Sequence, residues 1–153
     1  MITTPICAVD EITIPFPPSD VWRVVADVAG YPGWWPKSLH VRVVAGGTEA
    51  VGTDISLRPP GGRPFRCRVE SAEPPVRMLV RYHGGFLSGT GEWRLHSAGD
   101  GTRVVYTLDA SAAGWIVAVL GKFLHLGRMH SKSMQEVLTN LRDETARRRG
   151  AAG

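Results

Sequence analysis

The sequence predicts an α+β domain in which a curved antiparallel sheet of about seven strands wraps around one long C-terminal helix. Two short helices are expected between the first two strands. Three observations support this prediction. Short alternating segments are separated by turn residues, a single helical stripe of apolar residues lies near the C-terminus, and the length of 153 residues suits one domain.

The N-terminal elements are a strand followed by a helix. The segment "VDEITI" (residues 9–14) alternates between apolar and polar side chains and places Ile12 and Ile14 on one face. The segment "PFPPSDVWRVVADV" then predicts a helix with Ser19 as its N-cap and Gly30 as its stop signal. The apolar stripe of this helix consists of Val21, Val24, Val25 and Val28.

Further strands follow, joined by turn residues such as "PPGGRP" and "SAGDG". Consecutive strands with short connections pair as antiparallel neighbours, so these strands should form a meander. We expect them over residues 39–44, 53–58, 65–71, 76–83, 86–96 and 102–110.

Alternation along these strands separates a charged face from an apolar face. We interpret the charged face as cross-strand ion pairs in water rather than as a surface for an acidic ligand. It carries Arg66, Arg68, Glu70, Arg77, Arg81, His83, Glu92, Arg94, His96 and Arg103. The apolar face, which needs a covering element, carries Phe65, Cys67, Val69, Met78, Val80, Tyr82, Trp93, Leu95, Val104, Tyr106 and Leu108.

The cover is the C-terminal segment, which we expect to form one long helix, kinked or divided at Gly121 and Gly127. Residues at helical spacing form one stripe against the sheet: Ile116, Leu120, Phe123, Gly127, His130, Met134, Val137, Leu138 and Leu141. We assign residues 1–146 to a single domain. Residues 147–153, with three consecutive arginines, are expected to form a basic flexible tail.

A sheet curled around one helix does not fill its concave side completely, and the remaining space is expected to be a ligand cavity. The segment "GYPGWWP" (residues 30–36) would lie at its mouth, because amphipathic tryptophan rings suit a place with one apolar and one wet side. We expect an apolar pocket that solvent can reach, bordered by Trp35, Tyr82, Trp93, Tyr106, Gly127 and His130.

Composition argues against several classes of protein. The net charge of +4 comes without a nucleic-acid-binding motif, so we expect no nucleic-acid partner. Cys7 and Cys67 lie far apart and predict reduced thiols in a cytoplasmic protein, and no signal peptide is expected. The most apolar run, residues 114–127, is shorter than the roughly 20 residues of a membrane span. It predicts no transmembrane segment, although it also fits a docking surface for a membrane or a protein partner.

Four segments together resemble a known superfamily: "VDEITIP", "PPSDVWRVVADVAGYPGWWP", "FLSGTGEWRL" and "GDGTRVVYT". They resemble the START-like helix-grip proteins (SRPBCC), and most of all the bacterial polyketide cyclase/dehydrase and lipid-transport branch. The resemblance extends from about residue 8 to about residue 146. The residues that recur in the pattern of that superfamily are Asp27, Tyr31, Trp35, Gly89, Trp93 and Thr102.

The resemblance implies a helix-grip fold with a cavity for a hydrophobic or aromatic small molecule. Some members of the superfamily fold and dehydrate polyketide chains, and others carry lipids, quinones or sterols. Two functions therefore stay open: a polyketide cyclase/dehydratase-like protein that uses general acid/base catalysis, or a non-catalytic carrier or sensor of a lipid, quinone or aromatic metabolite. Either would act as a monomer or homodimer.

The candidate catalytic residues are His130, Tyr82 and Tyr106. A histidine near its ordinary pKa can act as base and then as acid, and tyrosine hydroxyls can stabilise an enolate. The predicted inner face shows no carboxylate and no arginine, which favours a carrier. We expect no metal and no cofactor, because the histidines lack ligand spacing and no phosphate-binding glycine loop is present. The candidate substrate-binding residues are Tyr31, Trp34, Trp35, Cys67, Met78, Trp93, Gly127 and Met134.

Overall fold

The structure is a computed structural model, and it describes residues 3–114 and 126–152. The strands are β1 (Thr3–Ile14), β2 (Arg42–Ala45), β3 (Asp54–Leu57), β4 (Phe65–Glu73), β5 (Arg77–His83), β6 (Leu87–Ala98) and β7 (Gly101–Ala113). The helices are α1 (Pro18–Ala26), the short 3₁₀ helices η1 (Val28–Gly33) and η2 (Lys37–Leu39), and α3 (Leu126–Ala152).

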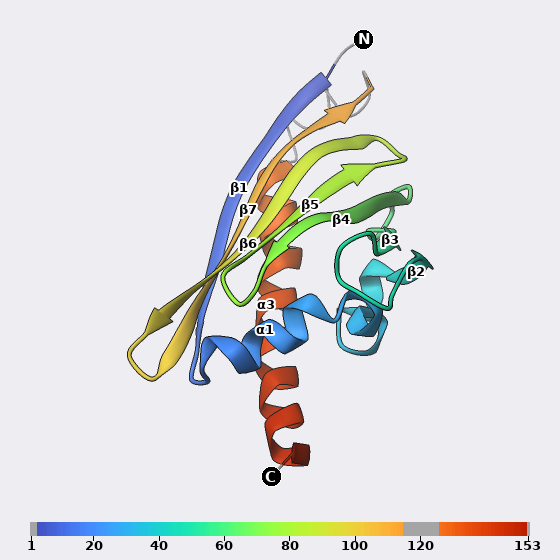
Figure 1. The fold of residues 1–153 in the computed structure, drawn as a ribbon. Helices are drawn as coiled ribbons and strands as arrows, with labels where there is room; N and C mark the ends of the chain where they lie inside the picture. The colour runs from blue at the N-terminus through green and yellow to red at the C-terminus, as the bar shows by residue number, and fades with distance from the viewer. Residues whose placement is uncertain (1–2, 115–125, 153) are drawn as a thin grey trace.

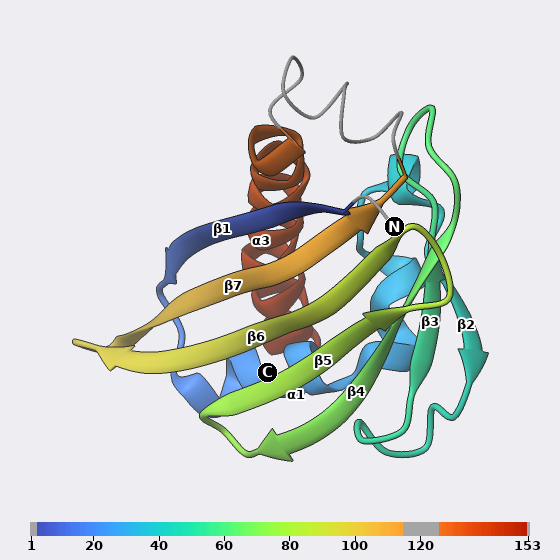
Figure 2. The same ribbon diagram turned by 90° about the horizontal axis from the view of Figure 1, so that it is seen from above.

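The strands form one seven-stranded antiparallel sheet in the order β1-β7-β6-β5-β4-β3-β2. Figure 1 shows the sheet curving around α3, with α1 and the 3₁₀ helices at one end. Figure 2, turned by 90°, shows α3 crossing behind the strands, and α3 packs against β1 and α1. The predicted fold, a curved antiparallel sheet around a C-terminal helix with short helices between the first two strands, is confirmed.

Two strands begin three or more residues away from their predicted starts. β1 begins at Thr3 rather than at residue 9, because it pairs with β7 along its whole length, from Thr3 opposite Ala113 to Ile14 opposite Thr102. β2 begins at Arg42 rather than at residue 39, because the three residues before His40 form η2. Both differences come from pairing and turn geometry that local alternation does not report.

The predicted signals for the first helix are also corrected. Ser19 lies inside α1, and the N-cap position belongs to Pro17, without a side-chain hydrogen bond. Pro18 takes the first helical position, where its fixed φ and missing N–H cost nothing. Gly30 does not stop the helix, since α1 ends at Ala26 and Gly30 lies within η1.

The charged face of the sheet carries cross-strand ion pairs, as interpreted from the sequence. Arg77 on β5 meets Glu92 on β6 with 2.7 Å between Nε and Oε2. At the other end of the sheet, the buried carboxylate of Asp54 on β3 receives Arg66 at 2.6 Å and Arg68 at 3.2 Å, both from β4. These pairs keep the charged side chains on the convex side and leave the concave side to apolar residues.

The core lies between the concave face and α3. Met78, Trp93 and Leu108 from the sheet are at most 2% exposed, as are Leu138 and Leu141 from α3. Burying an aliphatic or aromatic side chain of this size stabilises a fold by about 1.5–3 kcal/mol. The stripe residues expected at 116, 120 and 123 and the kink expected at 121 lie outside the described part of the chain, and so do the surroundings of residue 127.

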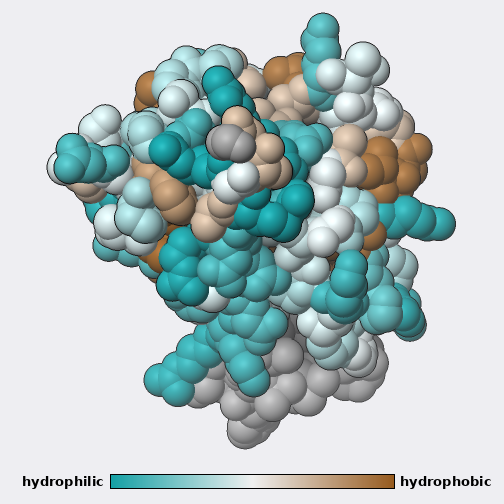
Figure 3. All heavy atoms as spheres, turned by 90° about the horizontal axis from the view of Figure 1, so that it is seen from below, coloured by the Kyte–Doolittle hydropathy of each residue, from teal (hydrophilic) through white to brown (hydrophobic). Residues whose placement is uncertain are grey.

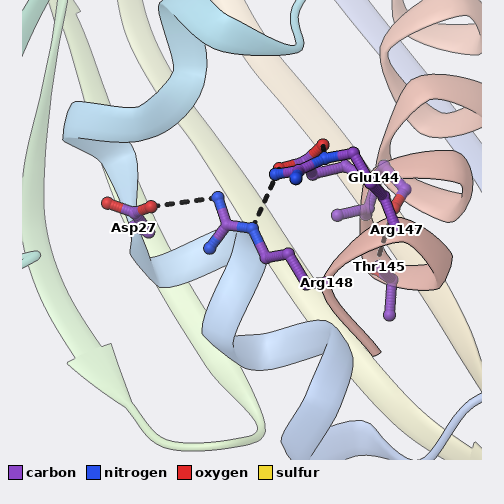
Figure 4. Close-up of polar contacts among 6 residues, drawn as sticks. Asp27, Glu144, Thr145, Arg147 and Arg148 are labelled. Carbon is purple, nitrogen blue, oxygen red and sulfur yellow. Dashed lines mark hydrogen bonds and ion pairs between the residues drawn. The ribbon is translucent and has the colours of Figure 1, made fainter. Parts of the chain in front are cut away.

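The C-terminal arginines continue α3 instead of forming the expected flexible tail. Arg148 bridges Glu144, one helical turn earlier, and Asp27 at the start of η1, with a nitrogen–oxygen distance of 3.0 Å in each pair (Figure 4). Arg149 pairs with Asp20 of α1. The helix extends because a glutamate four residues before an arginine supports helical structure, and because its end is tied to α1 and η1.

One face of the molecule is mostly polar. Figure 3 shows that the face carrying the C-terminal end of α3 is largely hydrophilic, with small separate apolar patches. In the described part of the chain, no helix has both the length and the apolar character needed to cross a membrane. The apolar run that the sequence suggested as a docking surface, residues 114–127, lies almost entirely outside the described residues.

Candidate functional site

Two tyrosines from the strands that flank β6 meet on the concave face of the sheet. Tyr82 lies on β5 and Tyr106 on β7, and their hydroxyl groups share a hydrogen bond across the strand between them. Gly91 on β6 makes this possible, because a Cβ atom at that position would overlap the Tyr106 hydroxyl. The structure therefore brings the two candidate catalytic tyrosines together.

The tyrosine pair keeps one hydrogen for a further partner. Tyr82 and Tyr106 are only 7% and 3% exposed. Burial raises the pKa of both hydroxyls above the ordinary value, so both stay protonated at neutral pH. Their shared bond uses one of the two hydroxyl hydrogens, and no described residue accepts the other. The pair can therefore donate one hydrogen bond to a ligand oxygen.

His130, from the first turns of α3, lies over this pair. Its ring stacks on that of Tyr106, with centroids 6.0 Å apart and an angle of 22° between the planes. The buried Nδ1 atom has no hydrogen-bond partner among the described residues. Burial lowers the pKa of the imidazole, and the nearby Asp10 carboxylate opposes that change only in part. The ring is therefore neutral at physiological pH and can accept a proton.

The inner face carries a carboxylate, contrary to the expectation from the sequence. Asp10 is 6% exposed and lies on β1 directly opposite Tyr106 of β7. It accepts hydrogen bonds from Ser131 Oγ at 3.0 Å and from Gln135 Nε2 at 3.3 Å, both on α3. Alternation alone would have found this residue, because Asp10 precedes Ile12 by two positions and therefore shares its face of β1.

The segment that contains both tryptophans packs as an aromatic stack. Trp35 stacks on Tyr31 with ring centroids 4.9 Å apart, and Trp34 meets Tyr31 edge-on at 5.2 Å. The backbone carbonyl of Trp34 accepts a hydrogen bond of 2.8 Å from Asn140, which ties the segment to α3. Both indole Nε1 atoms are buried without a hydrogen-bond partner among the described residues.

Tyr31 connects this stack with the tyrosines of the sheet. Its hydroxyl donates to the backbone carbonyl of Val25. The pKa of Tyr31 is raised, first by burial and then by the nearby Cys67, Asp27 and Tyr82. Cys67 lies on β4 opposite Tyr82, and burial raises the pKa of its thiol, which makes it a poor nucleophile.

The remaining candidate binding residues lie in the same buried cluster. Met78 is opposite Trp93 in the sheet, and Trp93 meets Tyr106 edge-on with centroids 5.0 Å apart. Met134 is buried on α3 and belongs to the same hydrophobic core. Gly127 lies in the first turn of α3, but its surroundings are outside the described part of the structure.

A groove of about 750 Å³ lies between η2 and α3. Residues 36–38 line one side, and α3 residues that include Gln135 and Asn140 line the other. The groove is open to solvent and includes none of the three tyrosines, so it is not the pocket expected from the sequence. The expected pocket includes Gly127 in its border, whose surroundings are outside the described part of the chain, and it stays a prediction.

The inward polar groups allow acid/base chemistry. A neutral imidazole can take up a proton, a protonated tyrosine pair can donate a hydrogen bond, and apolar surroundings strengthen both interactions. Within residues 3–114 and 126–152, no three His, Cys, Asp or Glu side chains are placed to hold a metal ion.

Several solved structures share this fold. Among solved structures, TTHA0849 from Thermus thermophilus has a TM-score of 0.76 at 24% identity, with 92% of this chain and 97% of the other covered. The Zhui aromatase/cyclase from Streptomyces sp. R1128 has a TM-score of 0.74 at 22% identity, covering 98% and 99%. Norcoclaurine synthase from Thalictrum flavum, in complex with dopamine and hydroxybenzaldehyde, has a TM-score of 0.70 at 11% identity, covering 95% and 88%.

These structural likenesses, all below 25% identity, establish a shared fold. No curated protein matches the sequence significantly. The family model described as polyketide cyclase / dehydrase and lipid transport matches residues 5–146, from β1 through most of α3. The chain therefore belongs to the polyketide cyclase/dehydrase and lipid transport family.

Proposed function

We propose that the chain binds a hydrophobic or aromatic small molecule between the sheet and α3, and acts on it as a polyketide cyclase or dehydratase by general acid/base catalysis. One observation carries the proposal. His130, whose buried Nδ1 has no partner among the described residues, stacks on Tyr106, whose hydroxyl is paired with that of Tyr82. Buried polar atoms in folded proteins normally have partners, so this group is suited to a polar ligand atom.

The proposed reaction begins at a substrate carbon that lies between two carbonyl groups. His130 accepts the proton of that carbon, and the electron pair of the broken C–H bond forms an enolate. The Tyr82–Tyr106 pair donates its free O–H to the enolate oxygen. The enolate carbon then bonds to the carbon of a third carbonyl group further along the same chain, and the oxygen of that carbonyl takes the proton back from His130.

Dehydration follows by the same groups in the proposed scheme. His130 accepts a second proton from the carbon next to the new hydroxyl group. The electron pair forms a carbon–carbon double bond, and the hydroxyl leaves as water after it receives the proton from the imidazolium. The histidine ends each step neutral, so no further reactant is needed.

The comparisons support this class of substrate. Zhui is an aromatase/cyclase, and the norcoclaurine synthase structure holds two aromatic molecules, dopamine and hydroxybenzaldehyde. Aromatic walls such as those of Tyr31, Trp35 and Trp93 suit ligands of this kind.

A second function, the non-catalytic carriage or sensing of a lipid, quinone or aromatic metabolite, is favoured by the composition of the inner face. Apart from a few polar groups, the buried side chains there are aliphatic or aromatic. Such a lining holds apolar molecules without requiring any chemistry.

One assay separates the two functions. The protein is incubated with a β-diketone that carries an aromatic ring and a third carbonyl group further along the chain, placed for ring closure. Binding is followed by tryptophan fluorescence, and loss of water from the substrate is followed by mass spectrometry. A cyclase or dehydratase converts the substrate, and its His130→Gln variant binds it without conversion. A carrier binds it without conversion in both forms. Failure of the wild-type protein to bind any aromatic or lipid probe would overturn both functions.

A further inference from the structure

Asp10 differs from the carboxylates on the outer face of the sheet. Glu92, for example, pairs with Arg77. Asp10 is buried on the inner face, and the described groups that bond to it are the neutral side chains of Ser131 and Gln135. A buried anion without a cation costs free energy. Stability alone therefore does not account for a carboxylate at this position.

The partners of Asp10 flank the candidate base. Ser131 directly follows His130 in α3, and Gln135 lies four residues after Ser131, on the same side of the helix. On the sheet, Asp10 lies opposite Tyr106, the residue on which the imidazole stacks. The two hydrogen bonds therefore fix the rotation of the helical turn that holds the imidazole over this tyrosine.

The charge of Asp10 matters when the imidazole takes up a proton. The tyrosine hydroxyls provide no countercharge, because burial keeps them protonated. On α3 itself, Arg128 and Lys132 are cationic and exposed to water. Burial lowers the pKa of His130, and the carboxylate of Asp10, from β1, raises it. Among the described residues packed around the imidazole, Asp10 supplies the negative charge.

We infer that Asp10 is a positioning residue for His130: it holds α3 in the rotation that stacks the imidazole on Tyr106, and its negative charge stabilises the imidazolium formed when His130 accepts a proton. This inference rests on the proposed function. The carboxylate takes no part in the proton transfer, since the substrate proton travels to the imidazole and back to a substrate oxygen. Asp10 therefore contacts neither the substrate nor the proton in transit.

The test compares Asp10→Asn with Asp109→Asn, a matched change at an exposed carboxylate on β7. Asparagine keeps the size and can still accept a hydrogen bond, so it removes mainly the charge. The imidazole signal of His130 is followed by NMR through a pH titration without ligand, and is assigned by its absence in His130→Gln. Turnover of the β-diketone substrate is measured in parallel.

We expect the titration midpoint of His130 to move to lower pH in Asp10→Asn and to stay unchanged in Asp109→Asn. Turnover should fall roughly 10- to 100-fold in Asp10→Asn, the range found when a carboxylate that orients a metal-bound histidine is lost, with a nearly unchanged KM. An unchanged midpoint in Asp10→Asn would overturn the inference. If Asp10→Asn fails to fold, the titration midpoint of His130 is measured in Asp10→Ser, which is smaller but also neutral.

The titration of His130 tests the inference about Asp10 independently of the turnover assay, which tests the proposed function. The titration needs no ligand, so it reports on Asp10 even when no substrate is converted. A protein that shows the midpoint shift but never converts a substrate would refute the catalytic function and the role of Asp10 in turnover, while the electrostatic link between the two residues would stand.

Discussion

The hydroxyl of Tyr106 occupies the space that a Cβ atom at Gly91 would need. A glycine inside a strand normally weakens it, and it often marks a place where another group approaches closely. Here the approaching group is an aromatic ring that crosses β6 to reach Tyr82. The hydrogen bond between the tyrosines therefore depends on the absence of a side chain at position 91.

Gly91→Ala should displace Tyr106 and break the bond between the two tyrosines. The new methyl group would also lie about 3.0 Å from Val80 Cγ2, so the site has little room to adjust. We expect a loss of about 1–3 kcal/mol in the free energy of unfolding, as for other overpacked cores, together with weaker ligand binding. Urea denaturation and fluorescence titration measure the two effects.

Two further variants control this prediction. Gly33→Ala adds the same methyl group where no atom lies within 4 Å, and it should leave stability nearly unchanged. Tyr106→Phe removes the hydroxyl that the methyl group would meet, so Gly91→Ala should cost less in that background. Equal costs of Gly91→Ala with and without the hydroxyl would show that the contact is not the cause.

The three tyrosines of the chain should resist ionisation in the folded protein. Burial raises the pKa of Tyr31, Tyr82 and Tyr106 above the ordinary value of 10.0. Unfolded tyrosines lose their protons near that pH while the folded ones keep theirs. The free energy of unfolding should therefore be unaffected below pH 10.0 and should fall as the pH rises above it. Tyrosinate absorbance near pH 10 in protein whose circular dichroism is still native would contradict this expectation.

Glu144 should make the end of α3 sensitive to acid. Hydrogen bonds from Arg147 and Arg148 lower its pKa to about 2 (Figure 4). A lowered pKa stabilises the fold above the ordinary value of 4.5, and this contribution is lost as the pH falls toward about 2. Because the arginines are partly exposed, we expect less than about 1 kcal/mol.

Acid titration of stability measures this contribution. Between pH 4.5 and 2, the free energy of unfolding should fall less in Glu144→Gln than in the wild-type protein. Glu136→Gln, at an exposed position of the same helix, should follow the wild-type curve. If the free energy of unfolding changed with pH in the same way in all three proteins, the ion pairs of Glu144 would not stabilise the fold.

The fold could be predicted because its signals are local. Turn residues separate the strands, and alternation correctly placed Tyr82, Trp93 and Tyr106 on the buried face. The same rule places Asp10 on the inner face, since it lies inside the predicted strand two residues before Ile12, but inward residues were assigned only from residue 65 onward.

Other features depend on contacts between distant parts of the chain. Arg148 is ordered by Asp27, which is 121 positions away in the sequence, so the C-terminal arginines looked like a solvated tail. The role of Gly91 likewise depends on a ring from the neighbouring strand. Neither the periodicity of one segment nor its composition reports such a partner.

The most direct test of the proposed chemistry is the rate–pH profile of the wild-type protein and of His130→Gln on the β-diketone substrate. His96→Gln, on the outer face of β6, serves as the matched control. Wild-type turnover should fade only below pH 6.5, because burial lowers the pKa of His130 and a protonated ring cannot accept a proton. In His130→Gln turnover should fall roughly 100- to 10,000-fold with little change in binding. Equal turnover in the wild-type protein and His130→Gln across the pH range would contradict the account.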